Sequence, residues 1–422
     1  MAQIDQIFSE FEAVSNERLA SYFLETPGEL KLVGRAPRSV AEATRMVELA
    51  AKNQIKVFTG SGHRFPREVA DIPGVVMDFR NLAAVRMVDG RNLFGEVERG
   101  VVFPDLFSAL GKQDFRPACP VTPLSPEAVT DYLIREPTWD VSKFPEAKIG
   151  PLEVVLADGR VQRTGAHALS LKTVPWTGEG GPYFSQWYQG SRDTYGIVVS
   201  AKILIYPHWG KKKYLHFGFS GMAPALAVLK EISRRGYCQE GYLVEKAEGE
   251  SAGIILSAAV EAFEELGNYN VREIDRIARK QGGSPEQAPD PAGDASRIQA
   301  RREKQSLPFF CSFDRAEDLW GKIKGFLGGR GINRARLLAL SFGMGRELYL
   351  SPDWEGGEAE YREIQRGIMD LVYPAGAFFD MLPYHLSQIM YKKDDTYYRH
   401  LLKIKRLMDP QNILNPQEFM EF

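Results

Sequence analysis

A turn at residues 59–66 carries the residue types best suited to hold a phosphate group. It reads Thr-Gly-Ser-Gly-His-Arg-Phe-Pro and follows residues 55–58, whose alternating apolar side chains predict a strand. Glycines let the main chain approach a ligand closely and adopt positive φ, so several N–H groups can converge on one anion. The pattern G-x-G-x-x-G does not apply, because Phe65 and Pro66 stand where that pattern begins a helix. On these residues alone, the turn fits either a phosphate-binding loop or a surface turn between strands.

The composition excludes several other kinds of chemistry. Cys119, Cys238 and Cys311 lie far apart and make no C-x-x-C pair, which argues against a zinc ribbon, an iron–sulfur cluster or a disulfide framework. Lys and Arg number 53 against 55 Asp and Glu, so nucleic acid is not expected as a partner. No stretch approaches the roughly 18 apolar residues that span a bilayer, and no signal-peptide core is visible near Met1. We therefore expect no membrane span and a cytoplasmic location.

The elements that must position the turn follow from local patterns. At 422 residues the chain is too long for one ordinary core, and both halves alternate helix and strand, which predicts two α+β units. Ser39 and Glu42 have capping-box spacing and predict a helix that runs to about Asn53. Asp158-Gly159 between two apolar runs predicts a β-hairpin. In the first half we also expect strands at 75–79, 93–98 and 197–206, a helix at 103–110, and irregular structure over the proline-rich residues 117–147.

A second unit begins near Trp209. Residues 278–306 have the low hydrophobicity and Pro/Gly/Ser content of a flexible excursion. Around that excursion the periodicity predicts strands at 213–219, 336–341 and 347–350, and helices at 224–235, 260–281, 316–327 and 358–371.

Six pieces of the first 208 residues, taken in order, resemble the FAD-binding domain of the vanillyl-alcohol-oxidase/p-cresol-methylhydroxylase (PCMH) flavoproteins. A seventh piece, KIKRLMDPQNILNPQEF, resembles the segment in which members of this family return from the substrate domain to the flavin domain. Residues 210–395 match only in outline. The six pieces are PRSVAEATRMVELAAKN, VFTGSGHRF, GVVMDFRNLAAV, FGEVERGVVFPDLFSAL, LEVVLADGRVQRTG and GSRDTYGIVVSAKILIYP.

The resemblance implies an α+β fold, with a two-part FAD-binding domain of the PCMH type and an α+β substrate (cap) domain that has an antiparallel sheet. The residue pattern itself predicts an N-terminal helical segment over 1–28. The resemblance places the FAD-binding domain over 29–208, the cap over 209–395 and the return over 396–422. It also implies that FAD is bound by Thr59, Gly60, Ser61, Gly62, His63, Arg64, Phe65, Thr130, Gly190, Ser191, Thr194, Gly196, Ile197, Val198 and Asn415.

His63 stands where several families of this superfamily bond a histidine covalently to the flavin 8α-methyl. The piece GSGHRF is similar to their G-S-x-H-S-F pattern, with Arg64 in place of a small serine. Another subfamily, the D-lactate and glycolate dehydrogenases, has a threonine here and binds FAD non-covalently. Two alternatives are therefore open for His63: a covalent bond, or plain contact with the phosphate or ribityl group, which we take as the default.

Two segments depart from the family's pattern. The glycine-rich segment that usually lines the isoalloxazine ring corresponds here to CPVTPLSPEAVTDYLIREPTW, which has no glycine, and residues 128–131 are the best candidate for its place. In the segment Gly190–Gly196, Asp193 stands where a flexible glycine is usual. These departures indicate either a different substrate or a subunit that has lost catalysis.

Flavin oxidation of an alcohol or hydroxy acid needs a base for the hydroxyl proton and groups that hold the substrate. Tyr384 and His385 form a polar pair in an apolar segment, and we assign them as proton acceptor and substrate ligand, with satisfied core residues as the alternative. The metal-binding histidine motif of the hydroxy-acid dehydrogenases is missing from SFGMGRELYLSPDWEGGEAE, so we expect no metal. Arg346 in this stretch either holds a substrate carboxylate or is an exposed surface arginine.

Two functions follow from the resemblance. The first is an FAD-dependent dehydrogenase or oxidase of a hydroxyl-bearing small molecule, such as a 2-hydroxy acid or a phenolic alcohol. Its electrons would pass to O2, a quinone or a separate electron-transfer protein. The second is a non-catalytic FAD-binding or scaffold subunit of a multi-subunit oxidoreductase, in which the proline-rich stretch and the 278–306 excursion contact a partner subunit. An NAD(P)H-dependent reductase has weaker support, because no nucleotide-binding glycine motif accompanies it.

Overall fold

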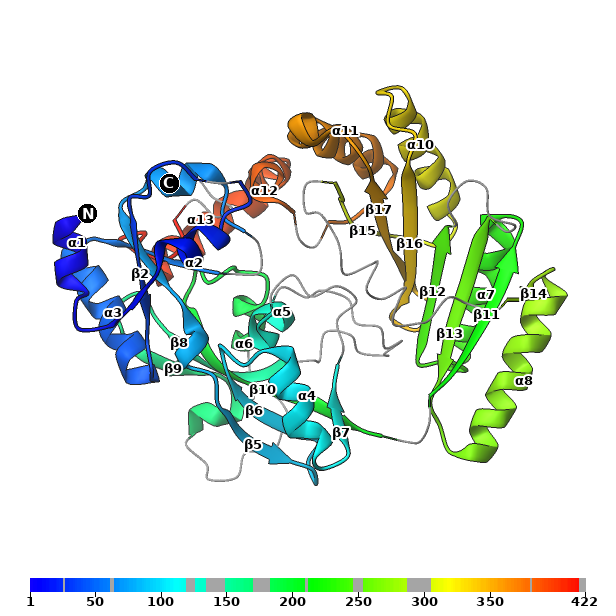
Figure 1. Ribbon diagram of the computed structural model, residues 1–422, viewed down its shortest axis with the longest axis horizontal. Coiled ribbons are helices and arrows are strands. Elements are labelled where there is room, and N and C mark those ends of the chain that lie inside the picture. Colours follow the sequence, from blue (N-terminus) through cyan, green and yellow to red (C-terminus); the bar gives the residue numbers. More distant parts are fainter. Residues whose placement is uncertain are drawn as a thin grey trace.

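The computed structural model shows two α+β domains that lie side by side (Figure 1). The N-terminal domain contains a four-stranded and a six-stranded sheet, and the cap domain contains a seven-stranded sheet. The described residues are 1–25, 27–60, 64–118, 126–133, 149–169, 183–208, 212–245, 253–286, 305–379 and 382–416.

The four-stranded sheet has the strand order β1-β2-β4-β3. Strands β2 and β3 run parallel to β4, and β1 is antiparallel to β2. Because the carboxyl ends of parallel strands meet at one edge, the residues that follow β3 and β4 lie near each other there. The strands are β1 (Glu12–Val14), β2 (Leu32–Ala36), β3 (Lys56–Thr59) and β4 (Gly74–Met77).

Helix α3 (Val40–Asn53) links β2 to β3 and begins where the capping-box spacing predicts. The Ser39 hydroxyl accepts the N–H of Glu42 at 3.1 Å. The Glu42 carboxylate accepts the N–H of Arg38 at 2.8 Å. In a standard capping box this carboxylate would bond the N–H of the N-cap residue, so here it bonds the residue before it. The helix places Met46, Val47 and other apolar residues in the core above the sheet.

The first 28 residues are only partly helical. They contain α1 (Ala2–Ile7), α2 (Asn16–Ser21) and also β1, which pairs with β2 at the edge of the sheet. A strand of three residues is too short to show a period of two, so the sequence pattern does not reveal it.

The six-stranded sheet is antiparallel, with β5-β6-β10-β8-β9 in order and β7 paired to β10. The predicted hairpin is confirmed as β8–β9, and Gly159 in its turn has φ +85°, a conformation that favours glycine. Short helices α4 (Phe103–Gly111), α5 (Ala128–Leu133) and α6 (Phe184–Tyr188) accompany this sheet. Its strands are β5 (Val85–Asp89), β6 (Phe94–Glu98), β7 (Phe115–Pro117), β8 (Ile149–Val155), β9 (Val161–Arg163) and β10 (Ile197–Pro207).

A carboxylate on β8 ties four of these strands together. Glu153 accepts hydrogen bonds from Arg86 of β5 at 2.7 Å, Ser200 of β10 at 2.7 Å and Arg163 of β9 at 3.0 Å. Burial alone would raise the pKa of Glu153, but these three donors outweigh it and hold the pKa at about 2. The carboxylate is therefore ionised in the folded protein at neutral pH.

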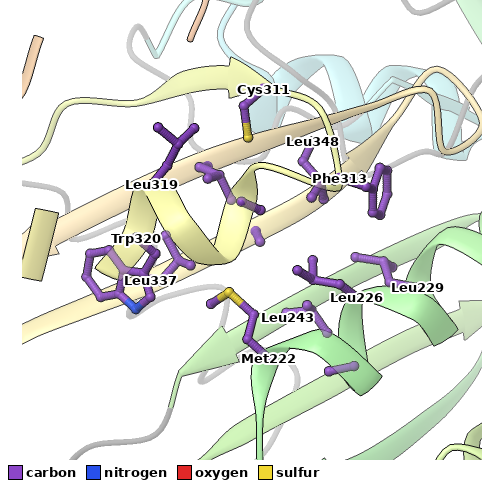
Figure 2. Packing of buried hydrophobic residues seen from close by; sticks show 14 of the residues in the cluster. Met222, Leu226, Leu229, Leu243, Cys311, Phe313, Leu319, Trp320, Leu337 and Leu348 are labelled. Atoms are coloured by element: carbon purple, nitrogen blue, oxygen red, sulfur yellow. The ribbon is translucent and has the colours of Figure 1, made fainter. Parts of the chain in front are cut away.

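The cap domain has the antiparallel sheet that the resemblance implies, in the order β14-β11-β13-β12-β16-β17-β15. Helices α7 (Met222–Arg234), α8 (Glu264–Lys280), α10 (Ala316–Gly328) and α11 (Tyr361–Val372) supply its apolar core. Figure 2 shows side chains of α7, such as Leu226, and of α10, such as Trp320, gathered against the strands. The strands are β11 (Lys213–Phe219), β12 (Glu240–Glu245), β13 (Ile254–Val260), β14 (Ser284–Pro285), β15 (Phe309–Cys311), β16 (Ala335–Phe342) and β17 (Glu347–Trp354).

Two boundaries in the cap differ from expectation. The helix expected from residue 260 begins at Glu264, because residues 254–260 form the buried strand β13 between β11 and β12. The start of the expected 278–306 excursion is also ordered structure, since α8 continues to Lys280 and β14 pairs with β11. Residues 287–304 of that excursion lie outside the described residues.

After the cap, α12 (Tyr384–Tyr391) and α13 (Asp395–Met408) bring the chain back to the N-terminal domain, where red α13 lies among the blue elements of Figure 1. Apolar residues of α13, such as Leu401 and Ile404, pack on the core of the six-stranded sheet. Beyond it the chain adds to β3: Val57 donates its N–H to Ile413 O at 2.7 Å and accepts that of Asn415 at 2.8 Å. None of the described helices is long and apolar enough to cross a membrane.

Candidate functional site

The carboxyl end of β3 is bonded to two segments that are distant in sequence. The Thr59 N–H donates to Asn415 Oδ1 at 2.8 Å, and Asn415 Nδ2 donates to Thr59 Oγ1 at 2.8 Å and to Arg192 O at 2.7 Å. Thr59 Oγ1 donates in turn to Asp193 Oδ2 at 2.7 Å. Thr59 and Asn415 are both among the predicted cofactor residues, and the structure brings them together directly before the glycine turn begins.

Arg99, which the sequence analysis missed, neutralises Asp193. Its guanidinium donates two hydrogen bonds to the Asp193 carboxylate, at 2.7 and 3.1 Å, and a third to Val198 O at 3.0 Å. Arg99 Nε donates to Thr130 Oγ1 at 2.6 Å. The two charged side chains are 1% and 3% exposed, so this is a buried ion pair with hydrogen bonds to both charged groups.

Asp193 keeps the backbone shape of the glycine it replaces. Its φ is +56° and that of Arg192 is +51°, both in the left-handed region that favours glycine. Asp is one of the few other residues that tolerate this region. The Asp193 carboxylate accepts the Val198 N–H at 3.3 Å, which helps to hold the strained turn.

Helix α5 is held in place through Thr130, which bonds both Arg99 and Glu127. Thr130 donates its hydroxyl hydrogen to Glu127 Oε2 at 2.9 Å while it accepts from Arg99. Burial raises the pKa of Glu127, against the opposing effect of the Arg99 guanidinium, and the charges of Asp78 and Arg18 also act on this carboxyl. Residues 128–133 are therefore a buried helix and not the irregular structure that the prolines predicted. The hydroxyl of Thr130 already has two protein partners.

Asp78 and Arg18 lie at the same edge of the four-stranded sheet. Asp78 follows β4, is buried, and receives both Nε and Nη2 of Arg18, the second at 3.2 Å. Burial, and then the Asp78 carboxylate, raise the pKa of Tyr22, whose ring would lie 3.2 Å from a Cβ added to Gly60. The glycine at position 60 thus allows the main chain to pass close to an aromatic ring.

A second buried ion pair fixes the return segment. Lys405 donates to Asp409 Oδ2 at 2.6 Å, to Thr194 O at 2.8 Å and to Leu414 O at 2.8 Å. Burial lowers the pKa of Lys405, and Asp409 offsets part of that effect. One ammonium group thereby joins α13, the segment 190–196 and the residue before Asn415.

Arg192 connects this region to the cap. Its side chain is buried, and its Nη2 donates to Leu382 O, two residues before Tyr384. The start of α12, which carries Tyr384 and His385, is therefore attached to the segment that contains Asp193. A continuous path of hydrogen bonds runs from Leu382 through Arg192 and Asn415 to Thr59.

His385 has the environment of a neutral imidazole. Its Nε2 is buried and has no hydrogen-bond partner among the described residues. Burial, reinforced by the Arg362 guanidinium, lowers the pKa of His385 to about 4. A buried nitrogen without a partner is costly in a folded protein, which makes it a candidate ligand-binding atom.

The chain resembles known proteins in structure rather than in sequence. No protein-family model matches the sequence, and no curated protein matches it. Among solved structures, p-cresol methylhydroxylase with substrate bound aligns at TM-score 0.84 and 14% identity, over 100% of this chain and 97% of that one. The chain has the fold of p-cresol methylhydroxylase. This confirms the fold and the two α+β domains expected from the resemblance.

Two further structures share the p-cresol methylhydroxylase fold with this chain. 4-Ethylphenol oxidase from Gulosibacter chungangensis, in its isoeugenol complex, aligns at TM-score 0.81 and 15% identity, over 99% of this chain and 96% of that one. Alkyldihydroxyacetonephosphate synthase aligns at TM-score 0.69 and 16% identity, over 91% of this chain and 76% of that one.

Within this fold, the remaining predicted cofactor residues lie in two segments, one after β3 and one before β10. Phe65 is a core residue: its ring packs against Phe23 and Phe58, and its N–H donates to Tyr22 O at 2.6 Å. Arg64 is exposed. In the segment Gly190–Gly196, the Ser191 hydroxyl donates to Tyr188 O of α6 at 2.9 Å and the Thr194 hydroxyl donates to Ser191 O at 2.6 Å. Gly190 and Gly196 end this segment, and Ile197 and Val198 begin β10. Ser61, Gly62 and His63 lie outside the described residues.

Arg346 lies in the turn between β16 and β17. Its side chain is exposed and its Nε donates to Gly343 O of the same turn at 3.0 Å. The turn packs on the end of α7, where Arg234 donates to Gly345 O at 3.2 Å. Among the described residues, no three His, Cys, Asp or Glu side chains cluster closely enough to hold a metal ion.

Proposed function

We propose that this chain is an FAD-dependent oxidoreductase that oxidises a hydroxyl-bearing small molecule by hydride transfer to flavin N5. The observation that carries the proposal is the hydrogen-bonded path from Thr59 to Leu382. It joins the strand end that precedes the glycine turn to the helix start that carries Tyr384 and His385. A cofactor bound at the first place and a substrate held at the second would both rest on one buried framework.

The residues present fit FAD. The glycine turn begins at the carboxyl edge of parallel strands, a common place for nucleotide phosphates. Gly190 has φ +73°, and a Cβ added to it would meet nothing within 4 Å, so the second segment retains open space. Thr59 and Asn415 would hold the main chain of the turn in place. His63 would contact the phosphate or ribityl group, or bond covalently to the flavin.

When bound, FAD supplies a two-electron acceptor, and the chain itself would supply binding and proton transfer. His385 would hold the substrate through its buried Nε2, and Tyr384 beside it, as a tyrosinate, would take the substrate's hydroxyl proton and become a neutral tyrosine. Of the two substrate classes that the sequence left open, we favour a phenolic alcohol. Arg346, for which the sequence left either a substrate carboxylate or an exposed surface position, is exposed on a turn against α7, and the structures with the same fold include a 4-ethylphenol oxidase and a p-cresol methylhydroxylase.

The alternative function, a non-catalytic FAD-binding or scaffold subunit, has one observation in its favour. Thr130 and Asp193 stand in the two segments where the flavoproteins that the chain resembles have glycines near the flavin. They form one network with Arg99, and all three polar side chains are bonded within the protein. In the leading proposal, electrons leave the flavin for O2, a quinone or a separate electron-transfer protein, and a partner subunit fits either function.

The test is the visible spectrum of the purified protein. A yellow protein that bleaches anaerobically with 4-alkylphenols or vanillyl alcohol supports the enzyme, whereas bound flavin that no phenol or 2-hydroxy acid reduces supports the scaffold alternative. A colourless protein that takes up no added FAD contradicts both. Flavin that stays in the acid precipitate of the native protein but not of His63→Ala would establish a covalent bond, with the exposed His400→Ala as control.

A further inference from the structure

Helix α11 of the cap is fastened to the N-terminal domain by four residues, which we call the interdomain latch. They are Glu25, Glu68, Tyr361 and Arg362. The Tyr361 hydroxyl donates to Glu25 Oε1 at 3.0 Å, and Arg362 Nη1 donates to Glu68 Oε1 at 3.0 Å. Arg362 Nε also donates to the Tyr361 oxygen at 3.0 Å, so the two cap residues support each other.

The two carboxylates of the latch belong to the segments that fix the end of the glycine turn. Phe65 of the turn donates its N–H to Tyr22 O at 2.6 Å, and its carbonyl accepts the N–H of Leu24 at 2.9 Å. The segments 22–25 and 65–68 therefore lie side by side, and each carries one carboxylate that bonds α11. The cap thus bonds both segments at once.

Both ends of the glycine turn are connected to parts of the chain that are made much later. At the start of the turn, Thr59 is bonded to Asn415 of the return segment. At its end, the latch connects the segments around Phe65 to the beginning of α11. A loop that is already held in its bound arrangement loses less freedom when a ligand binds, so it holds the ligand more tightly.

We propose that Tyr361 and Arg362 are positioning residues for FAD, which fix the end of the glycine turn through the latch and thereby slow the release of FAD. This inference rests on the proposed function, in which that turn binds the FAD phosphates. With the latch open, the end of the turn would lose its connection to the cap. Differences in affinity of this kind are expressed mainly in the dissociation rate.

The two bonds of the latch differ in their expected effect. Tyr361 is 4% exposed and donates to a charged group, so loss of its hydroxyl should speed FAD release about tenfold. The Arg362 and Glu68 side chains are 38% and 60% exposed, and water weakens such an ion pair. Loss of this pair should therefore speed release only about two- to fivefold.

The experiment measures FAD release from the full chain, through the rise in flavin fluorescence after dilution of the loaded protein. Where acid precipitation shows a covalent bond, all proteins carry His63→Ala. Tyr361→Phe and Arg362→Gln should release FAD faster by the factors given. The matched controls are Tyr373→Phe and Arg366→Gln, which make the same changes at exposed cap residues outside the latch and should leave the rate unchanged.

A second measurement separates the latch from a general loss of rigidity in α11. In a Glu68→Gln background the partner of Arg362 is already changed, so Arg362→Gln should have a smaller effect on FAD release than it has in the native chain. A role of Arg362 within the cap alone would give the same effect in both backgrounds.

Faster release confined to the latch variants, with the smaller effect in the Glu68→Gln background, supports the proposal. Unchanged rates, an equal rise in either control, or an undiminished effect of Arg362→Gln in that background overturns it. A chain that takes up no FAD contradicts the proposed function, and this inference with it. A chain that binds FAD and releases it equally fast from all variants contradicts this inference alone.

Discussion

Arg99 and Asp193 face each other as a two-point ion pair, with N···O distances of 2.7 and 3.1 Å, at the centre of the candidate cofactor site. The pair joins the residue after β6 to a turn that begins almost a hundred residues later in the chain. The pair explains an acidic residue in a turn where the flavoproteins that the chain resembles have glycine. Asp193 adopts the left-handed backbone conformation and its carboxylate is the counter-ion of the buried Arg99.

Loss of either partner should be costly, because it leaves a buried charge without its counter-ion. We expect Asp193→Gly and Arg99→Met each to lower the free energy of unfolding by about 3–5 kcal/mol. The double variant should lose less than the sum of the two, since it buries no uncompensated charge. Urea unfolding of all four proteins measures the coupling, and strictly additive losses would contradict the ion pair.

Gly100 next to Arg99 should not tolerate a side chain. A Cβ added there would lie 1.9 Å from Phe79 O, a backbone atom that can move only with the loop after β4. We expect Gly100→Ala to destabilise the protein by several kcal/mol, roughly the range of severe core substitutions. Gly111→Ala at the end of α4 is the matched control, since its Cβ would meet nothing within 4 Å. Equal melting temperatures for the two variants would show this packing to be wrong.

Asn415→Asp should weaken FAD binding. The substitution keeps the shape of the side chain and tolerates the left-handed backbone (φ +38°), but it loses the amide donors to Thr59 Oγ1 and Arg192 O. Loss of two buried hydrogen bonds beside the turn should raise the Kd for FAD about tenfold or more. Titration of the flavin-free protein with FAD, followed by fluorescence quenching, measures it. Asn412→Asp serves as control, because Asn412 has φ +49° but does not contact Thr59 or Arg192.

Protonation of Glu153 at acid pH should lower the free energy of unfolding. Its folded-state pKa of about 2 lies below the ordinary value of 4.5, so the ionised form is favoured by folding. This contribution is complete above about pH 5 and is lost as the pH falls toward 2. Because Arg163 is half exposed, we expect about 2 kcal/mol rather than the full value of the shift. Glu153→Gln should be less stable at pH 7 and should lose less stability than the native protein between pH 5 and 3 in denaturant titrations.

The sequence predicted the elements whose signals are local. The α3 cap at Ser39, the Asp158-Gly159 hairpin and the strand that ends at Pro207 are all present, because each depends on a few neighbouring residues. What it missed depends on partners far along the chain. Strand β1 forms only through β2, and α5 forms in a proline-rich stretch because Arg99 and Glu127 hold Thr130.

The candidate site was predicted in the same uneven way. Thr59 and Asn415 came from the resemblance and lie in contact, but nothing local marks Arg99 as the partner of Asp193. The departure from glycine at position 193 was itself a signal, since a buried carboxylate requires a nearby cation. Arg346 was chosen for its residue type alone, and the structure places it on an exposed turn against α7.

The Asn415 side chain bonds both Thr59 and Arg192, and this has a consequence for biosynthesis. A ribosome makes the glycine turn early, then the rest of the N-terminal domain and the whole cap, before it reaches the residues that lock that turn. On the proposed function, the nascent chain would hold an incomplete nucleotide site for most of its translation, and stable capture of FAD would follow synthesis of the last residues.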